Sequence, residues 1–141
     1  MNKFDTYVSQ NRLDLVRRTM VFEGTVFSES QTQEILGGGV IPHLDYTLVC
    51  GVRNVNRAWN WVCSSKEYGV DILEYLHSIV SDDAIRVPWL EGTFRDENTT
   101  VKILSSSYIP PLTTRREAFN EFDKKLTFVL NELKWYQPVE K

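Results

Sequence analysis

Few residues of this chain have the types and spacing that a chemical site requires. The three glycines at 37–39 lack the Lys-Ser/Thr pair that follows the glycines of a phosphate-binding loop. The two histidines, His43 and His77, are isolated, so no Cys/His cluster has metal-ligand spacing. No Ser/His/Asp arrangement stands out beyond chance. From residue types alone we expect no catalytic residue and no metal site, and we expect His77 to have a structural role beside core residues.

The two cysteines, Cys50 and Cys63, are predicted to lie on one helical segment. At a rise of about 1.5 Å per residue, their Cα atoms would be roughly 20 Å apart. A disulfide requires Cα atoms within about 7 Å, so the two cannot pair within a chain unless that helix breaks. We therefore expect two buried or half-buried thiols.

Length and composition describe an ordinary globular chain of 141 residues, with 42% hydrophobic and 25% charged residues. We expect one domain spanning 1–141. The net charge of −3 argues against general nucleic-acid binding, although Arg115 and Arg116 form a local basic pair. No apolar run approaches the ~20 residues needed to span a bilayer, and the first residues do not form a signal peptide. The cytoplasm is the default expectation, with no membrane partner.

The N-terminal part of the chain is predicted to be helical. A first helix is expected over about 5–22, ended by Gly24. Ser28 and Gln31 have the spacing of a capping box, in which each side chain satisfies a backbone donor of the other residue. The short helix that they open should stop at the glycines 37–39.

Three further helices follow from apolar residues spaced three and four apart. They are expected over about 43–63, around 72–80, and from a second capping box at Thr114 and Glu117 to about 134. The stripe of the first is Leu48, Val52, Val55, Trp59 and Val62, and that of the last is Phe119, Phe122, Leu126, Val129 and Leu133.

The segment between the last two helices has a different pattern. Residues 99–103 are β-branched and alternate, 105–107 supply a turn, and 108–109 run into two prolines, which have no N–H to donate to a ladder. The sequence thus predicts a mainly α domain that carries one small β-hairpin at about 99–111.

Four stretches, in the same order, resemble the N-terminal half of Fic proteins of the class whose inhibitory helix precedes the Fic core. Thr19–Gly24 fits the inhibitory pattern Ser/Thr-x-x-x-Glu-Gly/Asn, and 25–32 is similar to its continuation. Asn54–Ala58 matches the family's Asn-x-x-x-Ala helix, and Ile72–His77 matches its Leu-His helix. The segment 91–111 resembles its flap, with Glu91-Gly92-Thr93-Phe94-Arg95, Val101-Lys102-Ile103 and Tyr108-Ile109-Pro110-Pro111.

This resemblance implies an inhibitory-helix region at 1–39 and Fic-like helices at 40–141. The inhibitory motif would comprise Thr19, Glu23 and Gly24, with the Glu23 carboxylate pairing with an arginine that otherwise holds the γ-phosphate of ATP. The flap would dock a protein target by main-chain pairing through Val101, Lys102, Ile103, Tyr108 and Ile109. Within the family, Asn54, Ala58 and His77 would hold helices together.

The sequence also departs from the family. The catalytic motif His-Pro-Phe-x-Asp/Glu-Gly-Asn-Gly-Arg is not found in these 141 residues, and 104–107 carry no glycine at the flap turn. This chain alone is therefore expected to bind no cofactor, and ATP with Mg would bind only if a catalytic half is present. Helices near 43–63 and 114–134 would leave Trp59, Phe122 and Leu126 partly uncovered, which favours self-association or a bound partner helix.

Three hypotheses remain open. The first is the regulatory and target-docking part of a Fic-type protein adenylyltransferase (AMPylation), whose partners are a protein target or a Fic catalytic half. The second is a non-enzymatic helical binding module or antitoxin-like inhibitor with a truncated Fic-like fold. The third is an unrelated helical protein, such as an adaptor.

Overall fold

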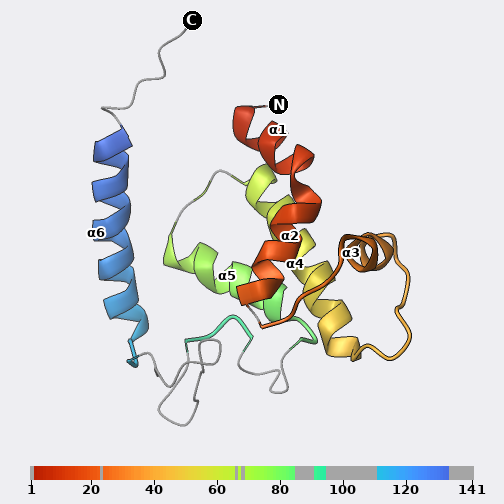
Figure 1. Cartoon of the computed structure of the whole chain (residues 1–141). Helices are drawn as coiled ribbons and strands as arrows, with labels where there is room; N and C mark the ends of the chain where they lie inside the picture. The colour runs from red at the N-terminus through yellow and green to blue at the C-terminus, as the bar shows by residue number, and fades with distance from the viewer. Residues whose placement is uncertain are drawn as a thin grey trace, which may run out of the picture.

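The computed structural model describes residues 2–22, 24–65, 67, 69–84, 91–94 and 111–133, which are mainly helical as predicted (Figure 1). The described part contains no strand, and the residues of the expected hairpin, 99–110, lie outside it. The helices are, in order, α1 (Lys3–Gln10), α2 (Arg12–Phe22), α3 (Glu29–Leu36), α4 (Tyr46–Ser64), α5 (Val70–Ser81) and α6 (Arg115–Leu133).

The predicted first helix at 5–22 is divided into α1 and α2 at Asn11. The Asn11 backbone N–H still donates to the Tyr7 carbonyl at 3.0 Å, and the Asn11 side-chain Nδ2 donates to the same oxygen at 2.8 Å. An asparagine side chain that bonds nearby backbone competes with regular helix geometry. The interruption is therefore local, and α1 and α2 remain adjacent along the chain (Figure 1).

Both predicted capping boxes are confirmed. Ser28 Oγ accepts from the Gln31 N–H at 3.1 Å, and the Ser28 N–H donates to Gln31 Oε1 at 2.9 Å, at the start of α3. Thr114 and Glu117 make the same reciprocal pair at the start of α6, at 3.2 and 2.8 Å. The backbone and side-chain hydrogen bonds from Thr114 lower the pKa of the Glu117 carboxyl.

The start of the long helix α4 was predicted at about 43, which is wrong by three residues. His43 has a φ of 71°, in the left-handed region that an α-helix does not use. The helix begins at Tyr46, because the Asp45 carboxylate accepts the Thr47 N–H at 2.9 Å and serves as the N-cap.

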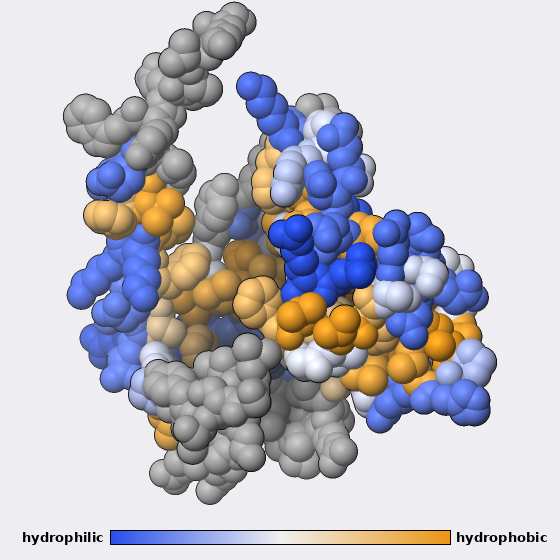
Figure 2. All heavy atoms as spheres, in the orientation of Figure 1, coloured by the Kyte–Doolittle hydropathy of each residue, from blue (hydrophilic) through white to orange (hydrophobic). Residues whose placement is uncertain are grey.

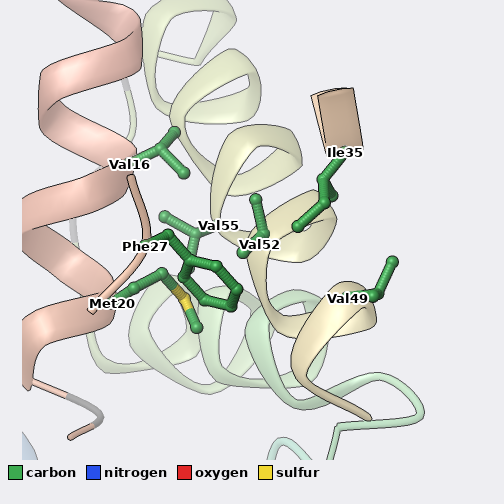
Figure 3. Close-up of a cluster of buried hydrophobic side chains, with 7 residues drawn as sticks. All are labelled: Val16, Met20, Phe27, Ile35, Val49, Val52 and Val55. Carbon is green, nitrogen blue, oxygen red and sulfur yellow. The ribbon is translucent and has the colours of Figure 1, made fainter. Parts of the chain in front are cut away.

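The core lies between α2, α3 and α4 (Figure 3). Its buried side chains are Val16, Met20, Phe27, Ile35, Val49, Val52 and Val55. The predicted α4 stripe is confirmed at Val52 and Val55, whereas Val62 is only half-buried. The buried face of α4 is wider than that stripe because helices α1, α2, α3 and α5 all pack against it.

Where α2 and α4 are in contact, Gly51 of α4 faces Met20 of α2. A Cβ atom at Gly51 would lie 3.2 Å from Cε of Met20, which is a tight contact against a buried side chain. The absence of a side chain at Gly51 therefore leaves room for the end of the Met20 side chain.

Helix α6 stands beside α5 and away from the core of the body (Figure 1). Its first residue, Arg115, forms ion pairs with Asp71 and with Glu74 of α5, and Nε of Arg115 lies 2.7 Å from Oε1 of Glu74. The apolar stripe of α6 is not fully covered, because Phe119 is 52% and Val129 is 48% exposed.

The three residues expected to be partly uncovered, Trp59, Phe122 and Leu126, are all half-buried. Cys50 is buried and Cys63 is half-buried, both thiols are free, and both residues lie on the unbroken α4, as predicted. Among the described helices, none is long and apolar enough to cross a membrane.

Candidate functional site

The segment Thr19–Gly24 forms the end of α2 and the turn that follows it. Thr19 Oγ1 donates to the Leu15 carbonyl at 2.8 Å, within the helix. The Gly24 N–H donates to the Val21 carbonyl at 2.9 Å, and the Thr25 N–H donates to the Met20 carbonyl at 3.0 Å. Together with the φ of +80° at Gly24, these two bonds form a Schellman motif.

The glycine of the predicted inhibitory pattern therefore ends α2, whereas the threonine bonds a carbonyl within the helix. Helix packing holds this end in place, because Val16 and Met20 of α2 are 0% and 3% exposed. Glu23 lies outside the described residues, as do the flap residues Val101, Lys102, Ile103, Tyr108 and Ile109. The predicted site residues are thus not brought together within the described part of the chain.

A small pocket of about 250 Å³ adjoins the end of α2. Met20 of α2 and Thr25 of the following turn line one part of it, and α4, α5 and Ala84 supply the remainder. Its polar lining consists of the hydroxyls of Thr25 and Thr47 and the imidazole of His77, so no carboxylate, lysine or arginine is among its described lining residues.

His77 does not lie beside the core as expected; it is exposed. Its Nδ1 atom accepts the Gly92 N–H at 2.8 Å, which ties the 91–94 segment to α5. The approach is close, because a Cβ atom at Gly92 would lie 2.9 Å from Cβ of Ser78, and Gly92 has a φ of +69°. The role of His77 is therefore to join two segments.

Asn54, on the buried face of α4, connects this helix to the end of α5. It is 4% exposed, and its Nδ2 donates to the carbonyls of Val80 and Asp82, at 3.2 and 2.5 Å. These carbonyls belong to the C-terminal end of α5, where the last backbone oxygens lack helical partners. Arg57, one turn further along α4, adds an ion pair with Asp82 at 3.1 Å.

A larger pocket of about 490 Å³ lies between α1, the end of α4, α5 and α6. Figure 2 shows hydrophobic side chains gathered in the recess between α6 and the body. Its apolar lining is Phe4, Trp61, Val62, Ile72, Leu73, Leu76 and Phe122. The Trp61 ring packs against Tyr75 of α5 with centroids 5.1 Å apart, which supports its position.

Two carboxylates, those of Asp5 and Glu67, also line this larger pocket, while no lysine or arginine is among its described lining residues. The remaining polar lining comes from Asn2, Cys63 and Ser65. A mostly apolar concavity of this size with a few polar groups has the dimensions and character of a small-molecule site. Within the described residues, no cluster of three His, Cys, Asp or Glu side chains is arranged to hold a metal ion.

Periodicity in the sequence did not reveal this pocket. Phe4, Trp61 and Phe122 come from three helices that are far apart along the chain, and only Phe122 belonged to a predicted stripe. The available signal was weak: Phe4 precedes the first predicted helix, and Trp61 lies outside the predicted stripe of its helix.

Comparison with protein-family models, with curated proteins and with solved structures finds no match to this chain.

Proposed function

We propose that this chain is the regulatory and target-docking part of a Fic-type protein adenylyltransferase. One observation carries the proposal: the polar residues of the Fic-like stretches are used to join helices. Asn54 bonds the end of α5, and His77 accepts the N–H of Gly92, which lies in the flap-like segment. The bond between His77 and Gly92 joins two of the stretches that resemble the family, and this contact is what supports the proposal.

The turn after α2 supports the proposed inhibitory role. A Schellman motif fixes the direction in which the chain leaves α2, and the buried Val16 and Met20 fix the helix itself. A glutamate in this motif would act on a catalytic part that carries His-Pro-Phe-x-Asp/Glu-Gly-Asn-Gly-Arg. Its carboxylate would pair with the arginine of that motif and occupy the position of the ATP γ-phosphate, while the flap would dock the target protein.

The test is complementation with a Fic catalytic fragment from the same genome on a separate chain. Removing one member of a desolvated, hydrogen-bonded charge pair costs about 2–5 kcal/mol. Glu23→Gln should therefore weaken inhibition of target adenylylation at least ~10-fold, since 1.4 kcal/mol corresponds to tenfold. Adenylylation is measured with labelled ATP over a range of concentrations of each variant.

Glu29→Gln is the matched control, because Glu29 is exposed at the start of α3 and should leave inhibition unchanged. If wild type and Glu23→Gln inhibit equally, Thr19–Gly24 is an ordinary helix end and the proposal fails.

A second candidate function is a non-enzymatic helical binding module that acts as an antitoxin-like inhibitor. The partly exposed stripe of α6 favours it, with Phe119 and Val129 about half exposed on a helix that packs only beside α5 in the described part of the chain. Such a module would bind a catalytic half in the complementation experiment with equal affinity whether residue 23 is Glu or Gln. Calorimetry of both variants against the same fragment distinguishes the two functions.

A further inference from the structure

We propose that the 490 Å³ pocket between α1, α4, α5 and α6 binds a small organic cation with an apolar body. This inference does not depend on the proposed Fic function. The pocket has a size typical of small-molecule sites, which range over about 300–1,000 Å³.

The apolar side chains that form the floor of the pocket favour a ligand with an apolar body. Ile72, Leu73 and Leu76 of α5 line it, and α4 adds Trp61 and Val62. These side chains are half-buried or, for Leu73, 46% exposed, so the floor is accessible from solvent. Covering such a surface with an apolar ligand body is favourable, because it removes both surfaces from water.

The positive charge of the ligand is specified by two kinds of lining group. The first is aromatic: Phe4, Trp61 and Phe122 come from three helices, and the faces of aromatic rings attract an ammonium group, most strongly for tryptophan. Trp61 is held by its contact with Tyr75.

The second kind of group is the pair of carboxylates, Asp5 and Glu67. Neither makes a side-chain hydrogen bond or ion pair with another described residue. The nearby acidic residues of α5, Asp71 and Glu74, by contrast both form ion pairs with Arg115. The local charge that remains for a ligand in the described lining is therefore negative, which complements a cation and repels an anion.

The experiment uses the full chain and three probes that share one apolar body. They are benzyltrimethylammonium, its uncharged isostere neopentylbenzene, and the anion phenylpropionate. Binding is measured by calorimetry, and occupancy by the rate at which N-ethylmaleimide alkylates Cys63, which lines the pocket. Cys50 is 8% exposed and lies outside the pocket, so it serves as the internal reference.

We expect the cation to bind and to slow alkylation of Cys63 severalfold, with Cys50 unchanged. Asp5→Asn and Glu67→Gln should each weaken cation binding by up to about fivefold, and Glu29→Gln, the same change on the exposed start of α3, should not. Trp61→Leu keeps an apolar side chain and should weaken binding of the cation more than that of the isostere. Circular dichroism of each variant establishes that it is folded.

Equal affinity for the cation and its uncharged isostere, or tighter binding of the anion, would overturn the assignment. So would protection of Cys63 that rises with protein concentration, together with a doubled mass in light scattering. That result would mean that a second copy of the chain covers the pocket.

Discussion

Replacing Asn54 by alanine should destabilise the protein more than any other single asparagine change on α4. The side chain is 4% exposed, and its Nδ2 donates to two carbonyl oxygens, those of Val80 and Asp82. Each such bond contributes about 0.5–1.5 kcal/mol net, so the loss of both predicts a decrease of about 1–3 kcal/mol in the free energy of unfolding. For a chain of this length, that corresponds to a decrease of roughly 4–12 °C in Tm.

The measurement is urea and thermal unfolding followed by circular dichroism. Asn60→Ala is the matched control, because Asn60 is exposed on the same helix. Hydrogen exchange adds a local readout, since the last turn of α5 should lose protection in the Asn54 variant before the rest of the helix does. If Asn54→Ala and Asn60→Ala differ by less than about 0.5 kcal/mol, the range of ordinary surface substitutions, Asn54 does not hold α5 against α4.

The other predictions concern the helix ends and the chemistry of the chain. Gly24→Ala should lower the free energy of unfolding, measured with urea, by about 1–2 kcal/mol. The φ angle of Gly24 is +80°, and nothing lies within 4 Å of an added Cβ, so the whole effect comes from backbone strain. The hydrogen bonds from Thr114 lower the pKa of Glu117 in the folded state. The ionised Glu117 carboxylate therefore stabilises the folded state above its unfolded pKa of about 4.3, and this stabilisation is lost as pH falls through the folded pKa. Protection factors of the amides in the first turn of α6, taken relative to the intrinsic exchange rate at each pH, should fall below about pH 4 in the wild type and stay constant in Glu117→Gln. A constant wild-type protection factor would contradict the cap assignment. Finally, incubation of the chain with labelled ATP and a lysate should label no protein, and the Glu23→Gly variant should give the same result. The reason is that the sequence contains neither a general base nor a phosphate nest of the Fic type. Labelling that depends on the chain would refute this prediction.

The helical class and most helix ends could be predicted from the sequence alone. Ser28 with Gln31 and Thr114 with Glu117 were recognisable as capping boxes, and the structure contains both. Gly24 was recognisable as the end of α2. These features were predictable because each depends on hydrogen bonds between residues at most five positions apart. The Fic-like role of Glu23 and of the flap stays a prediction.

Tertiary structure decided which of these residues meet. Asn54 bonds carbonyls 26 and 28 residues away, and His77 bonds Gly92, 15 residues away. The larger pocket gathers Phe4, Trp61 and Phe122 from α1, α4 and α6. No local pattern specifies such contacts, because they depend on how several helices pack around α4, and a helix contacted on more than one side has no single apolar stripe. Periodicity therefore predicted each helix separately, whereas the hydrogen bonds of Asn54 and His77 and the larger pocket depend on the packing of the helices.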